Sequence, residues 1–195
     1  MNYLIIGNGV AGTEAALAIR KSDADGTITV LTASPHPYYY RPSVIEYLAN
    51  GITRERLIIY KGDFYEKNRI TTLLGTTVKS IVPDKKLVLD SNGREHPYDR
   101  LLLATGADPS LPPIEGAHLK GIFTLRGIED ADRIRDFAGN AKRAVVVGGG
   151  LLGLESAHSL AKLGLEVCVV EVCSRLLPRQ LDTDGARTLQ RLLEE

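Results

Sequence analysis

Cysteine is scarce in this sequence, and so is any excess of charge. The 195 residues include two cysteines, Cys168 and Cys173. Two cysteines cannot form the multiple-disulfide framework of small secreted domains, so we expect a cytoplasmic protein. The 24 basic residues balance the 24 acidic ones. A net charge near zero argues against nucleic acid or an anionic membrane as the main partner.

Long apolar runs are also missing, and none could span a bilayer. The apolar start "MNYLIIGNGVAG" has no basic residues ahead of it and is interrupted by glycines. We therefore interpret it as a buried strand rather than a signal peptide. With 44% hydrophobic and 25% charged residues, the composition is that of an ordinary globular protein. The length suits one domain, or two small or incomplete ones.

The most informative feature that is present is an internal repeat. "NYLIIGNGVAGTEAALAIRKSDADGTITVLT" aligns with "RAVVVGGGLLGLESAHSLAKLGLEVCVVE". Each copy opens with an apolar run, at residues 3–6 and 144–147, which predicts a fully buried parallel strand. A G-x-G-x-x-G motif and apolar residues at helical spacing follow, and each copy ends in a β-rich run. Each copy therefore predicts a β-α-β unit.

The three glycines of each motif have separate physical roles. The first allows a tight strand-to-helix turn, the second lets the backbone approach a pyrophosphate, and the third lets helix and strand pack closely. The helix start then offers free N–H groups and a positive dipole end to the phosphates. The glycines are Gly7, Gly9 and Gly12 in the first copy and Gly148, Gly150 and Gly153 in the second.

The two copies differ where the second strand ends. The second copy ends in Glu171, about twenty residues after its glycines, where a carboxylate binds ribose hydroxyls and repels a 2′-phosphate. This favours NADH over NADPH, although Arg175 lies close by and a solvated charge is the alternative interpretation of Glu171. The first copy ends in Thr32, so a hydroxyl or a backbone N–H must supply its ribose contact.

The segments between and after the copies predict further elements. Residues 43–50 are typical of a short helix, with Ser43 as a possible cap and Gly51 as its end. Residues 76–100 predict an antiparallel meander, and residues 101–104 another buried strand. Residues 106–116 are rich in Pro and Gly and indicate a linker. Helices are expected at residues 127–137 and from about residue 183 onward.

Taken together, these motifs resemble the FAD-dependent pyridine nucleotide-disulfide oxidoreductase superfamily over the whole chain. The order is G-x-G-x-x-G, then "LLLATGADP", then "GGGLLGLE". "YYYRPSVIEYLANG" and "RLLPRQLD" are similar to one branch. That branch holds NADH:rubredoxin and ferredoxin reductases and the NADH-oxidising flavin module of nitrite reductases, of which this chain resembles the N-terminal part.

The resemblance implies an α/β fold with two Rossmann-like dinucleotide-binding units, FAD first and NAD second. Their parallel sheets are accompanied by a β-meander, and the second unit is incomplete. It implies an FAD-binding domain at residues 1–112 and an NAD(H)-binding domain at residues 113–195, completed by another segment or chain. A homo-oligomer is an alternative.

The resemblance also implies site residues. The FAD site would comprise Gly7, Gly9, Val10, Ala11, Gly12, Thr32, Ala33, Arg41, Pro42, Val78, Ala104, Thr105 and Gly106. The NADH site would comprise Gly148, Gly150, Leu151, Leu152, Gly153 and Glu171. Glu155 matches an acid near the meeting point of nicotinamide and flavin. No metal site is expected, because the four histidines share no metal-like spacing.

Two departures from the superfamily pattern shape the expected function. The redox-active cysteine is absent, and Ser43 stands near its place; Cys168 is expected to be a small buried hydrophobe. A Gly-Asp motif and a C-terminal interface domain are also missing from the 195 residues. We therefore expect an NADH-dependent flavoprotein that passes electrons to an acceptor protein or an attached redox module. The alternatives are a nucleotide-binding fragment without turnover and an NADH oxidase.

Overall fold

The computed structural model describes residues 1–194, which fold into two compact units. The first unit contains Met1–Tyr40 and Glu55–Asp108, and the second contains Arg41–Arg54 and the chain from Pro109 onward. The chain therefore leaves the first unit after Tyr40, returns to it at Glu55 and leaves it again after Asp108. The assignment of residues 1–112 to FAD and 113–195 to NAD(H) stays a prediction.

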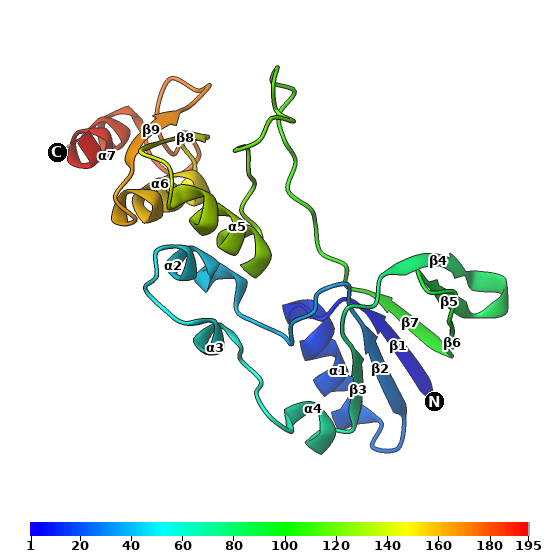
Figure 1. Cartoon of the computed structure of the whole chain (residues 1–195). Coiled ribbons are helices and arrows are strands. Elements are labelled where there is room, and N and C mark those ends of the chain that lie inside the picture. The colour runs from blue at the N-terminus through cyan, green and yellow to red at the C-terminus, as the bar shows by residue number, and fades with distance from the viewer. Residues whose placement is uncertain (195) are drawn as a thin grey trace. The chain divides into compact units, whose positions relative to one another are not determined.

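The first unit is built on a four-stranded sheet with the order β3-β2-β1-β7, in which all neighbours are parallel. The strands are β1 (Asn2–Ile6), β2 (Thr27–Leu31), β3 (Ile70–Leu73) and β7 (Arg100–Leu103). Helix α1 (Val10–Ser22) connects β1 to β2 and covers one face of the sheet (Figure 1). This confirms the predicted β-α-β unit and its buried first strand.

Both faces of that sheet are covered because side chains alternate along each strand. Ile5 packs with Ala16 of α1 and with Ile28. Leu4, on the opposite face, packs with Leu31 and with Val88 of the meander. The meander consists of β4 (Val78–Val82), β5 (Leu87–Asp90) and β6 (Glu95–Pro97), paired antiparallel as predicted. The first unit is thus a sheet between a helix and a meander.

The second unit contains the second β-α-β repeat. Strands β8 (Arg143–Val147) and β9 (Glu166–Val170) pair in parallel and are connected by α6 (Leu151–Lys162). Helices α2 (Val44–Leu48) and α5 (Ile128–Ala138) pack against each other, and α2 also packs against α6. Helix α7 (Thr183–Glu194) follows the repeat. The remaining short elements are η1 (Arg41–Ser43), α3 (Arg54–Leu57), α4 (Phe64–Lys67) and η2 (Pro83–Lys85).

Side-chain hydrogen bonds fix α2 within the second unit. The Tyr47 hydroxyl donates to Asp132 Oδ1 of α5 at 2.6 Å. The Ser159 hydroxyl of α6 donates to the carbonyl oxygen of Ile45 at 3.1 Å. Arg54 pairs with the same Asp132 carboxylate. These contacts explain why residues 41–54 belong to the second unit although they interrupt the first in sequence.

The structure corrects the predicted burial of two strands and one cysteine. Val145 of β8 is 65% exposed and Leu103 of β7 is 59% exposed, so neither strand is fully buried. The reason is that β7 is an edge strand and that β8 and β9 form a sheet of two strands. Cys168, on β9, is exposed rather than buried for the same reason.

The predicted caps of the short helix α2 are also wrong in detail. Ser43 stands at the N-cap position, but its backbone is helical and its side chain makes no capping hydrogen bond. At the other end Asn50, with φ 58°, takes the left-handed conformation expected of Gly51. Gly51 instead donates its N–H to the carbonyl oxygen of Glu46 at 2.9 Å.

Candidate dinucleotide-binding sites

The first glycine turn connects β1 to α1 and is closed by backbone contacts. Gly7 has φ +114°, a conformation that side chains rarely adopt. Its N–H donates to the carbonyl oxygen of Leu31 at 2.8 Å, which ties the turn to the end of β2. A Cβ atom on Gly12 would lie 1.9 Å from the carbonyl oxygen of Gly7, so helix and turn can approach this closely only at a glycine.

The second glycine turn has the same backbone. Gly148 has φ +116°, and a Cβ atom on Gly153 would lie 1.9 Å from the Gly148 carbonyl oxygen. The Gly148 N–H donates to the carbonyl oxygen of Val170 at 2.7 Å. The duplicated motif thus produces duplicated geometry, which is what the sequence repeat predicts.

The middle glycine of each motif leaves the helix start open to a ligand. Gly9 and Gly150 are the N-cap residues of α1 and α6, without a side-chain cap. A Cβ atom on either glycine would meet nothing within 4 Å. The N–H groups of the first helical turn have no acceptor within their own helix. They belong to Val10, Ala11 and Gly12 in α1 and to Leu151, Leu152 and Gly153 in α6. Such open N–H groups fit the oxygens of a pyrophosphate.

The end of β2 shows which ribose contacts the first site could offer. Thr32 is buried, and its backbone N–H already donates to the carbonyl oxygen of Leu73 at 3.1 Å. Its hydroxyl accepts a weak hydrogen bond from the Ser34 N–H at 3.3 Å and keeps its own proton free to donate. The hydroxyl, and not the N–H, is therefore the group of Thr32 that could reach a ribose. Ala33 beside it is exposed.

The end of β7 lies directly against the first glycine turn. The Ala104 N–H donates to the carbonyl oxygen of Ile6 at 2.8 Å. A Cβ atom on Gly7 would lie 2.1 Å from the Ala104 carbonyl oxygen. Thr105 and Gly106 follow, and Gly106 has φ 75°. The structure thus brings the predicted "ATG" residues, the glycine turn and the end of β2 together where the parallel strands have their carboxyl ends.

Other predicted FAD residues are placed less tightly. Val78 begins β4 and packs beside the cluster of Leu4, Leu31 and Val88. Arg41 and Pro42 form part of η1, and both are exposed in the second unit. The roles of these three residues along a cofactor stay predictions.

In the second site the carboxylate of Glu171 is bonded to the glycine turn itself. Its Oε2 accepts the Gly149 N–H at 2.6 Å, and its Oε1 accepts the Cys173 N–H at 2.8 Å. The N–H groups of Cys173 and Gly149 hold the pKa of this carboxyl below its ordinary value. Glu171 is thus charged and fixed in orientation, rather than a freely solvated strand end.

Arg175 is the basic residue near Glu171 that weakened the predicted preference for NADH over NADPH. Its side chain is held within its own loop. Its Nε donates to the carbonyl oxygen of Leu181 at 3.2 Å, and its Nη2 donates to that of Pro178 at 3.1 Å. A guanidinium held in this way stabilises the loop after β9. Glu155 is exposed on α6, and its role near a nicotinamide stays a prediction.

The tyrosines before η1 divide between packing and exposure. Tyr39 is buried, whereas Tyr40 is 49% exposed. Tyr38 lies 5.7 Å from the ring of Tyr60, which stacks on Phe64 at 3.7 Å. Packing under the loop therefore accounts for Tyr39, and Tyr40 remains open to a ligand.

Sequence reasoning missed Asn8, which lies between Gly7 and Gly9. Asn8 is 8% exposed, and among residues 1–194 its Nδ2 has no hydrogen-bond partner. The signal in the sequence was a polar residue at a position that is glycine, Gly149, in the other copy. A buried donor without a partner beside an open helix start fits a site for a ligand rich in oxygen atoms.

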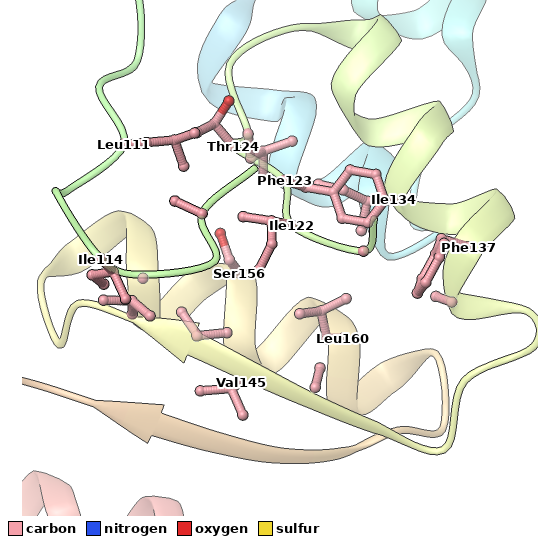
Figure 2. Close-up of a pocket in the computed structure, with 18 of the residues that line it drawn as sticks. Leu111, Ile114, Ile122, Phe123, Thr124, Ile134, Phe137, Val145, Ser156 and Leu160 are labelled. Carbon is pink, nitrogen blue, oxygen red and sulfur yellow. The ribbon is translucent and has the colours of Figure 1, made fainter. Parts of the chain in front are cut away.

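Sequence reasoning also missed an apolar cavity of about 660 Å³ in the second unit. Figure 2 shows linker residues such as Leu111 and Ile114 facing it, with Val145 of β8 and Leu160 of α6 opposite. The lining includes Leu152 and Gly153 of the second glycine motif, but it is mostly apolar and does not itself suit a pyrophosphate. Leu111 and Ile114 were the signal, because they are apolar residues within a linker.

Residues 1–194 contain neither a candidate metal site nor a candidate membrane-spanning helix. No group of three or more His, Cys, Asp or Glu side chains is arranged to hold a metal ion. No helix in that range is long and apolar enough to cross a membrane.

Comparison with known proteins agrees with the duplicated geometry. The family model described as pyridine nucleotide-disulphide oxidoreductase matches residues 1–195. The chain is 40% identical over 192 residues to the nitrite reductase (NADH) large subunit of Escherichia coli, covering 97% of this chain and 23% of that protein. It is 38% identical over 204 residues to an NADH oxidase of Methanocaldococcus jannaschii, covering 100% of this chain and 45% of that protein.

Among solved structures, NADH:rubredoxin oxidoreductase from Clostridium acetobutylicum superposes with a TM-score of 0.85 at 32% identity. That match covers 99% of this chain and 50% of the solved chain. The chain thus spans half or less of the length of these three proteins.

Proposed function

The chain belongs to the pyridine nucleotide-disulphide oxidoreductase family, and from this premise we propose that it is the NADH-oxidising part of an FAD-dependent electron-transfer protein. The observation that carries the proposal is the pair of glycine turns, equal in backbone geometry, of which the second alone has an acid at its strand end. Equal turns support two dinucleotides, and the unequal strand ends support two different ones.

The residues of the first unit fit FAD. Gly9 leaves room for a pyrophosphate, and the first N–H groups of α1 would donate to its oxygens. Thr32 would donate its hydroxyl to the adenosine ribose. Ala104 and the residues after it would lie along the ligand, starting at the carboxyl end of β7. Each of these groups orients the cofactor, and none takes part in a covalent step.

The residues of the second unit fit NADH. Gly150 and the first turn of α6 would hold its pyrophosphate, and Glu171 would accept hydrogen bonds from the ribose hydroxyls. The charge of Glu171 would repel the 2′-phosphate of NADPH. Arg175 is bonded to the carbonyl oxygens of its own loop, so its guanidinium would have to give up these bonds to pair with a 2′-phosphate.

Bound FAD would supply the redox chemistry, taking two electrons as a hydride from NADH and releasing them one at a time. The segment shortly after β2, where Ser43 lies, has no cysteine to receive those electrons, because the sequence has cysteines only at positions 168 and 173. We therefore propose that the electrons leave for a protein acceptor or an attached redox module. The names of the rubredoxin and nitrite reductase relatives support this class of acceptor.

The test is anaerobic reduction of the purified full chain. After incubation with FAD and gel filtration, the protein should carry a flavin absorbance near 450 nm that bleaches on addition of NADH and recovers with an added one-electron acceptor. NADPH should bleach it much more slowly. A preparation that retains no flavin would contradict the proposal.

Two alternatives predict different results, the first in the same anaerobic experiment and the second when that experiment is repeated in air. A nucleotide-binding fragment without turnover would retain FAD and bind NADH without bleaching. An NADH oxidase, the function named for the Methanocaldococcus jannaschii relative, would consume oxygen rapidly with NADH alone. Oxygen uptake comparable to the rate with a one-electron acceptor would favour that second alternative.

A further inference from the structure

Asn8 is the one polar side chain built into either glycine turn. Its Oδ1 accepts hydrogen bonds from the hydroxyl of Thr13 at 3.2 Å and from the hydroxyl of Tyr65 at 3.3 Å. The Tyr65 hydroxyl in turn accepts the Tyr38 N–H at 3.2 Å. This network holds the carboxamide at a fixed orientation, although Asn8 lies in a turn.

The Nδ2 of this fixed carboxamide has no partner among the described residues. Rotating the carboxamide by 180° would exchange its oxygen and nitrogen and leave one of them unpaired again, because both known partners lie on the same side. A buried amide atom without a partner is unfavourable, so its presence in a turn that faces a ligand requires an explanation.

The second glycine turn shows where a side chain at this position points. Gly149 is the equivalent residue, and a Cβ atom on it would lie 3.1 Å from the Cβ of Glu171 and 2.7 Å from Leu176. Because the two turns share their backbone, the side chain of Asn8 leaves the first turn toward the end of β2. A carboxamide that leaves the turn in this direction would face the region in which the second unit places its acid.

We propose that Asn8 binds the adenosine diphosphate half of FAD, donating its Nδ2 proton to a ligand oxygen and replacing the acid that the first copy lacks. The inference rests on the proposed function. Thr13 and Tyr65 are positioning residues, because they hold the carboxamide and do not themselves contact the ligand. The Tyr38 N–H links the same network to the loop of Tyr38, Tyr39 and Tyr40 before η1.

The test compares FAD affinity in four variants, followed by flavin fluorescence at a temperature where every variant is folded. Asn8→Ala should weaken FAD binding about tenfold, the scale of one lost hydrogen bond to a ligand. Asn8→Gly, which gives the first turn the Gly-Gly-Gly sequence of the second, should weaken it similarly and guards against a folding defect in the alanine variant. NADH affinity should stay within about twofold of wild type in both.

Asn8→Asp identifies the ligand oxygen. If Nδ2 meets a ribose hydroxyl, the aspartate can accept from that hydroxyl as Glu171 would, and FAD affinity should stay within about threefold of wild type. If Nδ2 meets the pyrophosphate, the aspartate should weaken FAD binding more than alanine does, because like charges repel. Both results support Asn8 as a binding residue once the alanine variant has lost affinity.

Tyr65→Phe is the matched structural control. It removes one hydroxyl from the network but leaves the Nδ2 donor, so FAD affinity should fall less than about threefold although the melting temperature of the apoprotein falls. The inference is overturned if Asn8→Ala binds FAD within about twofold of wild type, or if Tyr65→Phe weakens FAD binding as much as Asn8→Ala. A wild-type chain that binds no FAD contradicts both the proposed function and this inference, whereas wild-type binding with unaffected variants contradicts the inference alone.

Discussion

The two glycine turns of this chain have the same backbone geometry but differ in the residues at the neighbouring strand ends. The φ angles of Gly7 and Gly148 are 114° and 116°, and the closest approach of the third glycine is 1.9 Å in both. Yet the Ala104 carbonyl oxygen lies close to Gly7, whereas a Cβ atom on Gly148 would meet nothing within 4 Å. Thr32 follows the strand beside the first turn, whereas Glu171 follows the strand beside the second and accepts the Gly149 N–H.

This difference separates two kinds of information in the sequence. The glycine spacing specifies a turn that can accept a pyrophosphate, and it does so equally in both copies. The neighbouring residues specify which dinucleotide fits, and they differ between the copies. Family membership rests on the first kind of information, and the proposed order of FAD and NADH depends on the second.

The largest effect is expected from a methyl group added at the third glycine of each motif. Gly12→Ala and Gly153→Ala each place a Cβ atom within 1.9 Å of a backbone carbonyl oxygen, so helix and turn must separate. We expect each change to destabilise its own unit by about 1–3 kcal/mol. Gly12→Ala should abolish FAD retention, and Gly153→Ala should abolish NADH oxidation while FAD is retained. Thermal denaturation with separate FAD and NADH titrations would show this, and loss of both ligands in both variants would contradict the independence of the turns.

A methyl group at the middle glycine should affect the ligand without affecting the fold. A Cβ atom on Gly9 or Gly150 meets nothing within 4 Å, and both residues have extended backbone that alanine can adopt. The melting temperature of Gly9→Ala or Gly150→Ala should therefore stay within about 2 °C of wild type. Affinity for the dinucleotide of that turn should fall at least about tenfold, because the methyl group occupies the space of the pyrophosphate. Unchanged affinity measured by fluorescence titration would show that the ligand does not approach the turn there.

Some features of the fold and of the candidate sites follow from local sequence spacing, and others do not. The strand–turn–helix backbone, the meander and the placement of Glu171 follow from local spacing, and the structure has them. The exposure of Val145 was missed because burial depends on the strands beside β8, which the spacing of one strand does not reveal. The contact of Asn8 with Tyr65 joins residues 57 positions apart, so no local pattern could indicate it.

The charge of Glu171 is the main difference between the two strand ends. Glu171→Gln keeps the shape of the side chain but removes its charge, so NADPH should no longer be repelled. We expect NADH affinity to fall about threefold to tenfold and the preference for NADH over NADPH to shrink by a similar factor. Initial rates of flavin bleaching with each cofactor would measure the preference. An unchanged preference would mean that Glu171 serves only to fix the Gly149 N–H.

The pH dependence of the same site follows from the lowered pKa of Glu171. A carboxyl whose folded pKa is depressed stabilises the fold above its unfolded pKa, and this contribution is lost as pH falls through the folded pKa. The second turn should therefore stay organised through mildly acidic pH and lose NADH affinity only below the ordinary titration range of a glutamate. Glu171→Gln should show no such acid limb in NADH binding.

The smallest expected effect concerns the meander of the first unit, which has no counterpart in the second unit among residues 1–194. Asp90 of β5 accepts hydrogen bonds from His96 Nε2 at 3.1 Å and from the Arg94 and Asn92 N–H groups at 3.0 and 2.8 Å. His96 and these N–H groups hold the pKa of Asp90 below its ordinary value, so its stabilising contribution is present above the unfolded pKa and lost as pH falls through the folded one.

Asp90→Asn should therefore lower the melting temperature of the first unit by several degrees at neutral pH and by progressively less as pH falls below about 4. Asp84→Asn is the matched control, because Asp84 is exposed in the neighbouring turn of the same meander. This substitution should leave the melting temperature unchanged both at neutral pH and below pH about 4. FAD-dependent and NADH-dependent signals would report the two units separately in one melting series. If Asp90→Asn shifted the NADH-dependent transition as much as the FAD-dependent one, the two units would unfold together. The two turns would then bind their ligands independently but would not be independently stable.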